Sequence, residues 1–168
     1  MLSEEMSKRE IQMIGNAALL ERPGKVAFLS SRKVAPTAVM RCYDWATEMR
    51  DRGRCIIGGF QSALERDVLK LLLRGESPIV IVLARGLWRV VPTEFRDAIN
   101  AGFLLAVSPV SPNVTRVSEA TAAVRNGYVL DHCESAVFAS LDPNGSLARR
   151  VAERPAVRYS VLDGGSKK

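Results

Sequence analysis

The sequence predicts an α/β domain whose sheet is doubly wound and mostly parallel, with helices on both faces. Six short apolar runs alternate with helix-like stretches along most of the 168 residues. Uninterrupted apolar runs of this length are typical of strands buried on both faces. Strict alternation of strands and helices favours parallel pairing through right-handed crossovers, and the sequence therefore predicts helical layers above and below one sheet.

The expected elements can be assigned in chain order. An additional helix over about residues 4–18 is expected to precede the first strand. The glycines Gly53, Gly75 and Gly102 each stand where a helix would end before the next strand. The sequence predicts a single domain over residues 1–163, followed by a disordered tail over residues 164–168. The expected strands cover residues 25–30, 54–57, 78–83, 103–108, 136–141 and 157–162, and the expected helices cover residues 36–52, 62–74, 93–101, 115–130 and 146–153.

Charge and cysteine content limit the class of protein. Lys and Arg total 24 against 18 Asp and Glu, and this excess favours an anionic partner such as nucleic acid or a nucleotide. Cys42, Cys55 and Cys133 form no CxxC pair, which favours reduced thiols in a cytoplasmic protein over a disulfide framework. The amino terminus is charged, and no apolar run approaches the ~18 residues of a membrane span. We expect a cytoplasmic protein without a membrane partner.

Small, hydroxyl-bearing and cationic residues follow the expected strands. The ligand crevice of an open parallel α/β sheet lies beyond the carboxyl ends of its strands. Glycines there let the backbone approach a phosphate, and arginines can bind its oxygens through two hydrogen bonds. The sequence therefore predicts a phosphate-binding pocket at this edge, lined by Ser30, Ser31, Arg32, Gly58, Gly59, Phe60, Arg85, Gly86, Gly145 and Ser146.

Several catalytic and cofactor-binding classes lack their motifs. The sequence contains neither GxGxxG after the first expected strand nor GxxxxGK[ST], so dehydrogenases and P-loop ATPases are excluded. His132 is the single histidine, and its acidic and thiol neighbours would point in different directions on a helix, so neither a metal site nor a catalytic triad is predicted. Glu65 is the best acid–base candidate, although a carboxylate in a first helical turn is also favoured by the helix dipole.

Five short segments follow one another in an order that is informative. They are Val-Ala-Phe-Leu-Ser-Ser-Arg at 26–32, Ile-Gly-Gly-Phe at 57–60, the Ala-Gly and Leu-Ala-Val-Ser residues within 101–108, Arg-Asn at 125–126, and Gly-Ser-Leu at 145–147. In this order they resemble the Rossmann-like core of the DNA-processing protein A (DprA/Smf) family. The chain departs from the family pattern at Ser30, where the family has glycine, at Pro109, where it has glutamate, and at residues 61–67, which replace Gly-Ile-Asp-Ala-Ala-His.

The resemblance implies a protein that binds single-stranded DNA and passes it to a recombinase. It adds Arg125 and Asn126 to the phosphate-binding residues. The leading hypothesis is a binding protein without catalysis and without a cofactor. Phe60, Trp88 and Phe95 lie near the expected loops and could stack on bases, with Trp88 as the foremost candidate.

Two alternatives stay open at this stage. One is a nucleotide-binding sensor that forms a homodimer. The other is an enzyme that uses Glu65 on nucleoside monophosphates. The wider superfamily includes the "Lonely guy" phosphoribohydrolases, but their Pro-Gly-Gly-Xaa-Gly-Thr-Xaa-Xaa-Glu motif has no counterpart here, which disfavours hydrolysis.

Overall fold

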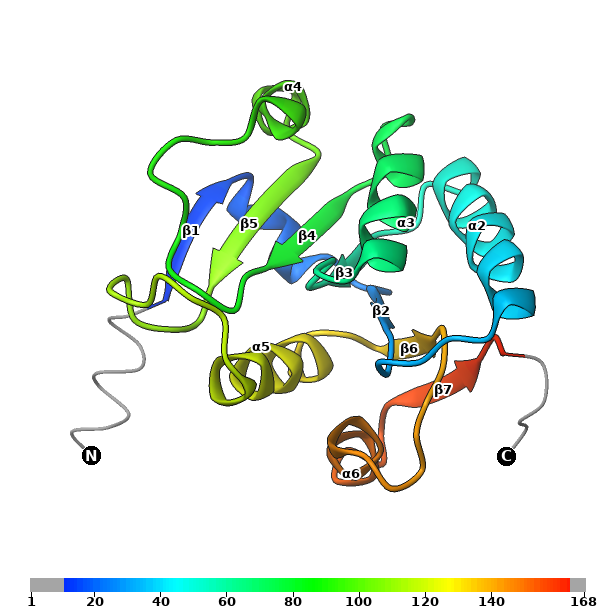
Figure 1. Ribbon diagram of the computed structural model, residues 1–168. Coiled ribbons are helices and arrows are strands. Elements are labelled where there is room, and N and C mark those ends of the chain that lie inside the picture. Colours follow the sequence, from blue (N-terminus) through cyan, green and yellow to red (C-terminus); the bar gives the residue numbers. More distant parts are fainter. Residues whose placement is uncertain (1–10, 164–168) are drawn as a thin grey trace.

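Residues 11–163 form one seven-stranded sheet with helices on both of its faces (Figure 1). The computed structural model describes residues 11–163. The spatial order of the strands is β1-β5-β4-β3-β2-β6-β7, and every neighbouring pair is parallel except β1 with β5. The strands are β1 (Gln12–Gly15), β2 (Val26–Leu29), β3 (Ile56–Gly58), β4 (Ile79–Val82), β5 (Leu104–Ser108), β6 (Ser135–Phe138) and β7 (Arg158–Val161). The predicted doubly wound, mostly parallel, Rossmann-like sheet is confirmed.

The helices form two layers on the sheet. The helices are α2 (Pro36–Asp51), α3 (Ala63–Leu73), α4 (Thr93–Ala101), α5 (Glu119–Asp131) and α6 (Ser146–Ala152), with a short 3-10 helix η1 (Ala17–Glu21). Helices α2, α3 and α4 cover one face, and α5 and α6 cover the other (Figure 1). The chain steps outward from β2 to β5 and then returns through α5 to β6, on the other side of β2. The strand order therefore reverses between β2 and β6, where ligands of such folds bind.

Each face of the sheet has its own apolar core. Phe28 packs with residues of α2, α3 and α4, whereas its neighbour Ala27 packs with residues of α5 and α6. Both side chains are fully buried. Successive residues of a strand point to opposite faces, so an uninterrupted apolar run supplies both cores at once. The apolar runs of the sequence therefore mark the central strands.

Local capping fixes the start of two helices next to the sheet's carboxyl edge. The Ser118 hydroxyl accepts a hydrogen bond from the backbone N–H of Thr121 at 3.2 Å, and the Thr121 hydroxyl accepts one from the backbone N–H of Ser118 at 2.9 Å. This reciprocal cap starts α5 at Glu119, later than the predicted residue 115. Ser62 and Glu65 cap α3 in the same way.

The prediction of a helix over residues 4–18 is wrong for the part that the structure describes. Gln12–Gly15 form β1, which pairs antiparallel with β5, and η1 follows. Gly15 has φ +111°, and a Cβ there would collide with the carbonyl oxygen of Leu104, so the chain can leave β1 at this point only through a glycine. Pairing with the edge of the sheet outweighs the local helical pattern, because it satisfies the backbone of β5 on its outer side.

Two further sequence-based expectations concern the ends of the chain and the membrane. The tail expected at residues 164–168 and the first ten residues lie outside the described part. Within residues 11–163, no helix is long and apolar enough to cross a lipid bilayer.

Candidate anion-binding site

Two cavities open at the carboxyl edge of the sheet. The larger one, of about 890 Å³, lies where the strand order reverses, between the loops after β2 and β6 and the first half of α5. The smaller one, of about 300 Å³, is bounded by α3, the segment after β4 and the start of α4. Arg125 on α5 lines both cavities. We call them the switch-point cavity and the aromatic cavity.

The switch-point cavity brings together more than half of the residues predicted for phosphate binding. They come from the ends of β2 and β6, from α5 and from the start of α6. They are Ser30, Ser31, Arg32, Arg125, Asn126, Gly145 and Ser146.

The serines of this cavity bind the protein's own backbone. The Ser31 N–H donates to the Ser140 carbonyl at 3.0 Å, and the Ser31 hydroxyl accepts from the Asp142 N–H at 2.9 Å. The Ser30 hydroxyl donates to the Ser31 carbonyl at 2.8 Å. The two bonds of Ser31 tie the loop after β2 to the loop after β6, and the bond of Ser30 lies within the loop after β2. The two serines therefore hold the shape of the cavity.

Charges in the switch-point cavity are balanced. Its lining includes three cationic side chains and three carboxylates. Arg32 pairs with Glu119 at 3.7 Å, and both side chains are about nine-tenths exposed. Exposed pairs of this kind contribute little binding energy and are readily rearranged. Arg32 is therefore available to an incoming anion but is not fixed in place for one.

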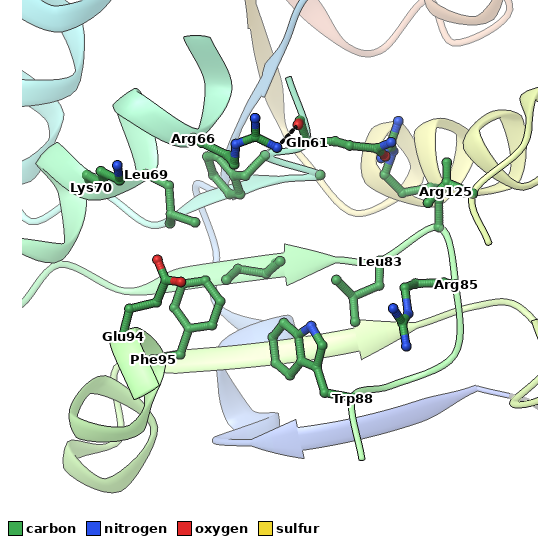
Figure 2. Close-up of a pocket in the computed structure, with 15 residues that line it drawn as sticks. Gln61, Arg66, Leu69, Lys70, Leu83, Arg85, Trp88, Glu94, Phe95 and Arg125 are labelled. Atoms are coloured by element: carbon green, nitrogen blue, oxygen red, sulfur yellow. Dashed lines mark hydrogen bonds between the residues drawn. The ribbon is translucent and has the colours of Figure 1, made fainter. Parts of the chain in front are cut away.

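The aromatic cavity has an apolar floor and a cationic rim (Figure 2). The rings of Trp88 and Phe95 stack with their centroids 5.4 Å apart and an interplanar angle of 29°. The remaining apolar lining comes mainly from α3, β4 and the residues just after β3. The cationic residues of the lining are Arg66, Lys70, Arg85 and Arg125, and its single carboxylate is that of Glu94.

Arg125 is the central charged group of the site. Its Nη1 donates to Gln61 Oε1 at 2.6 Å, and its Nε donates to Asn126 Oδ1 at 3.0 Å. Within residues 11–163, no carboxylate oxygen lies within 4.0 Å of its guanidinium nitrogens. Burial lowers the pKa of Arg125, and the negative charge of Glu65 only partly opposes this effect. A half-buried cation held by neutral partners is suited to an anionic ligand.

The turn after β3 makes room for this arginine. A Cβ on Gly59 would lie 2.5 Å from Cδ and 2.7 Å from Nε of Arg125. The Arg125 side chain can therefore lie against residue 59 only because that residue is a glycine. Phe60, the next residue, has φ +50° and is the only non-glycine residue of the described chain with positive φ. Its ring is buried in the core below. This turn directs Gln61 toward Arg125, and uncommon backbone conformations of this kind concentrate at functional sites.

Gly58 and Gly86, two of the glycines predicted for the site, line neither cavity. Both allow close packing of the backbone instead. A Cβ on Gly58 would lie 2.8 Å from the Phe28 carbonyl oxygen of the neighbouring strand. A Cβ on Gly86 would lie 2.6 Å from the Pro112 carbonyl oxygen. Both positions require glycine for close backbone approach. Arg85, which precedes Gly86, does line the aromatic cavity.

The acid–base candidate Glu65 is held in a helix cap. Its Oε1 accepts from the backbone N–H of Ser62 at 3.0 Å, and its own N–H donates to the Ser62 hydroxyl at 3.2 Å. Glu65 lines neither cavity. The carboxylate of Glu65 therefore has a structural role, which is to cap the start of α3.

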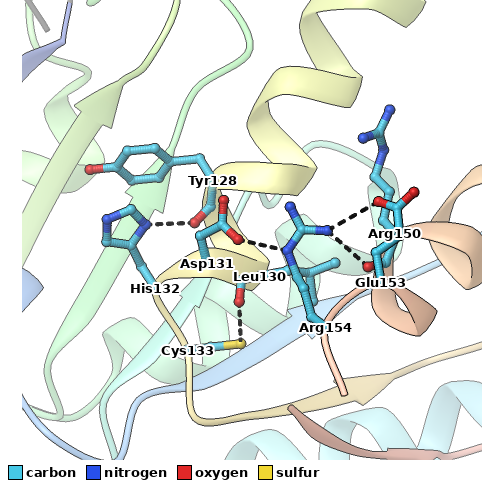
Figure 3. Close-up of polar contacts among 8 residues, drawn as sticks. All are labelled: Tyr128, Leu130, Asp131, His132, Cys133, Arg150, Glu153 and Arg154. Carbon is cyan, nitrogen blue, oxygen red and sulfur yellow. Dashed lines mark hydrogen bonds and ion pairs between the residues drawn. The ribbon is translucent and has the colours of Figure 1, made fainter. Parts of the chain in front are cut away.

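The histidine lies at the opposite edge of the sheet, in a polar cluster beyond the end of α5 (Figure 3). Its Nδ1 lies 2.8 Å from the Tyr128 carbonyl oxygen, and its ring stacks on that of Tyr128 with centroids 4.0 Å apart. Among residues 11–163, no three His, Cys, Asp or Glu side chains form a group that could hold a metal ion. His132 therefore has a packing role.

The sequence analysis missed three residues of the site. Gln61 fixes Arg125, and Arg66 and Lys70 supply two cations of the aromatic cavity. Arg66 and Lys70 are four residues apart on α3 and therefore share one helical face. Two cations four residues apart, on the helix that follows a glycine-containing turn, could have indicated a cationic cavity wall from the sequence.

The fold and the site together define a doubly wound α/β protein whose sheet has cavities with cationic side chains at its carboxyl edge. Solved structures of similar fold include DNA processing protein A from Helicobacter pylori, with TM-score 0.68 and 18% identity over 89% of this chain and 70% of that chain. The same protein from Streptococcus pneumoniae gives TM-score 0.68 and 17% identity, over 89% of this chain and 54% of that one. The molybdenum cofactor binding protein of Rippkaea orientalis is more distant, with TM-score 0.56 and 12% identity over 83% of this chain and 77% of that chain.

These similarities establish the fold. No protein-family model matches the chain, and no curated protein matches it in sequence. The chain spans just over half of the S. pneumoniae protein, so the activity of that whole protein does not transfer with the fold.

Proposed function

We propose that the protein binds single-stranded DNA without catalysis, with backbone phosphates held at Arg125 between the two cavities. The single observation that carries this proposal is the state of Arg125. Its guanidinium is partly desolvated, is held by two neutral amide side chains and has no carboxylate within ion-pair distance in residues 11–163. A phosphate oxygen would supply the missing countercharge.

The surroundings of Arg125 fit a chain of phosphates. The aromatic cavity supplies four cations against one carboxylate, and the switch-point cavity continues on the other side of Arg125. A strand that crosses Arg125 would meet an excess of cations in the aromatic cavity and a charge-balanced lining in the switch-point cavity. Cationic grooves next to aromatic side chains are typical of proteins that bind single strands. The structure of the H. pylori protein concerns a single-stranded DNA binding mode, and its fold covers most of this chain.

Binding without turnover is supported by the position of Glu65. Its carboxylate caps α3 and lines neither cavity, so it is poorly placed to act on a bound nucleotide. Of the alternatives, a small-nucleotide sensor keeps one favourable observation, because a cavity of about 300 Å³ is near the lower end of the size of small-molecule sites. Binding of a nucleoside monophosphate as tight as that of an oligonucleotide would favour the sensor.

The affinity for an oligonucleotide as a function of salt tests the main proposal. We expect fluorescence anisotropy with a labelled oligo-dT to give a log–log slope of about −0.7 per neutralised phosphate. Arg125→Met should weaken binding strongly, because it removes the charge and keeps most of the side-chain volume. Arg154→Met, which changes an arginine at the other edge of the sheet, is the matched control. A slope near zero, or no binding at physiological salt, contradicts the proposal.

The likeness in fold also motivates a proposed partner and cell compartment. We propose a bacterial cytoplasmic protein of DNA processing that hands its bound strand to a recombinase and acts as a homodimer. Sedimentation of the protein alone would measure its oligomeric state. Sedimentation with a recombinase, with and without oligo-dT, would show whether a complex forms.

A further inference from the structure

The aromatic cavity offers more than charge to a bound strand. Trp88 follows β4, and Phe95 lies in the first turn of α4, so two different elements supply the stacked pair. Phe95 is buried, but Trp88 is only partly buried and faces the cavity (Figure 2). Leu69 and Ile81 complete an apolar floor beside the rings. A flat, neutral, aromatic group would fill this space well.

The rim of the cavity has the opposite character. Four cationic side chains come from α3, from the residue after Ala84 and from α5, and they surround the apolar floor (Figure 2). Arg66 is oriented by a hydrogen bond from its Nη1 to the Gln61 carbonyl at 2.9 Å. Arg85 is oriented by a bond from its Nε to the Gly86 carbonyl at 3.2 Å. A ligand that suits both parts has a flat uncharged ring attached to an anionic chain.

We propose that the aromatic cavity takes one unstacked nucleobase of the strand whose phosphates lie at Arg125. This inference rests on the proposed function and adds a base subsite to it. Arg125 lines both cavities, so a phosphate held there can place its attached base in either one. Only the aromatic cavity offers rings on which a base can stack.

A base subsite makes the protein selective for single strands. A base in a duplex is paired and stacked, so entry into the cavity would first require unpairing, whereas a single strand can present the base freely. The volume of about 300 Å³ is large enough for one nucleobase. Selectivity for single strands then comes from the cavity and not from the phosphates.

The test uses the unmodified protein and two oligonucleotides with the same number of phosphates. One is oligo-dT, and the other carries abasic sites throughout. We expect the abasic strand to bind about 5- to 150-fold more weakly, which is the range for loss of stacking on one aromatic platform. The salt dependence should be the same for both strands, because their phosphates are the same.

Tryptophan fluorescence reports on the cavity directly. The chain has two tryptophans, and Trp45 on α2 stacks on Phe28 and lines neither cavity. Trp45→Phe should leave binding unchanged and leave Trp88 as the single reporter. Its emission should be quenched by oligo-dT and not by the abasic strand. Trp88→Ala should bind both strands equally, and Trp88→Phe should retain most of the preference.

The outcomes separate the two proposals. Equal affinity of the unmodified protein for both strands would overturn the base subsite and leave the phosphate site standing. No salt-dependent binding of either strand would overturn both proposals. Should Trp88→Ala fail to fold, the abasic comparison and Trp88→Phe still decide the question.

Discussion

Two half-buried arginines associated with α5 have opposite surroundings. Arg125 projects from α5 at the carboxyl edge of the sheet, and its side-chain hydrogen bonds to the described residues go to the neutral side chains of Gln61 and Asn126. Arg154 lies beyond the far end of α5, where its Nε donates to Asp131 at 2.7 Å and its Nη1 lies 3.7 Å from Glu153 (Figure 3). Within residues 11–163, Arg125 has no carboxylate at ion-pair distance, whereas Arg154 has two.

The surroundings of Arg125 and Arg154 shift the pKa values of their guanidinium groups in opposite directions. The pKa of Arg154 is raised, chiefly by the hydrogen bond to Asp131. The pKa of Arg125 is lowered, chiefly by burial. A paired arginine of this kind stabilises the fold, whereas an arginine without a countercharge costs folding free energy and gains it back from an anion. This difference is the reason for proposing Arg125, and not Arg154, as the ligand-binding arginine.

The contrast is tested most strongly by exchanging each arginine for methionine. Arg125→Met should weaken binding of oligo-dT by about 1.5–3 kcal/mol, as for hydrogen bonds to a charged group, and should not lower stability. Arg154→Met should leave binding unchanged and lower the free energy of unfolding by about 1 kcal/mol, since its ion pairs are partly exposed. Anisotropy titrations and urea unfolding measure the two quantities. Equal effects of both variants on binding would remove the distinction.

The Arg154 end of α5 should respond to alkaline pH. Burial raises the pKa of Cys133 from 9.0 to about 11, although Lys25 and Arg154 act in the opposite direction. Above pH 9 the unfolded chain releases this proton and the folded chain retains it, so stability falls as pH rises toward 11. The loss from this thiol is at most about 3 kcal/mol.

Urea unfolding between pH 8 and pH 11 measures this effect. Cys133→Ala should show a smaller decrease than the parent protein, and the difference between the two curves isolates the thiol. Parallel curves would show that Cys133 ionises alike in both states. Binding of oligo-dT, which depends on Arg125 at the other edge, should not distinguish the two proteins.

Glycines next to the two arginines provide a finer comparison. Gly59→Ala places a Cβ 2.5 Å from the Arg125 side chain and should displace it, weakening binding by about 1 kcal/mol. Gly127→Ala, inside α5, meets Arg154 Nη2 at 3.5 Å, which is an ordinary contact. It should raise the free energy of unfolding by about 0.5–1 kcal/mol, because alanine favours the helix, and leave binding unchanged. Unaltered binding of oligo-dT by Gly59→Ala would show that binding does not depend on the packing of Arg125 against residue 59.

The smallest expected effect concerns Glu65, whose charge partly balances that of Arg125. Glu65→Gln should tighten binding of oligo-dT slightly, by about 0.2–1 kcal/mol, since the nearby negative charge is removed. Incubation of the parent protein with nucleoside monophosphates should release no free base. Release of base that is abolished in Glu65→Gln would instead support the enzyme alternative.

Much of the fold could be predicted because its signals are local. The apolar runs at β2, β4 and β5 are buried on both faces, and helix starts such as Ser62 before α3 carry their own caps. The amino-terminal segment is the exception. Its residues have a helical pattern, but β1 forms through pairing with β5, about ninety positions away in sequence. No local pattern reports such a pairing.

The candidate site shows the same division between local and distant information. The residues that follow the strands could be found, since parallel strands deliver their carboxyl ends to one edge. Their individual roles could not be found. Gly58 and Gly86 followed strands as predicted, yet they face neighbouring backbone and line neither cavity.

The sequence by itself determined the class of fold, the edge of the sheet that carries the candidate site and some of the cationic and aromatic residues near it. Only the tertiary structure decided that Arg125 meets Gln61, sixty-four positions away, and that it lines two cavities at once. Local propensity and periodicity depend on residues within a few turns or one strand. Which charges find a partner depends on segments brought together by packing, and that is why the contrast between Arg125 and Arg154 emerges only in the folded chain.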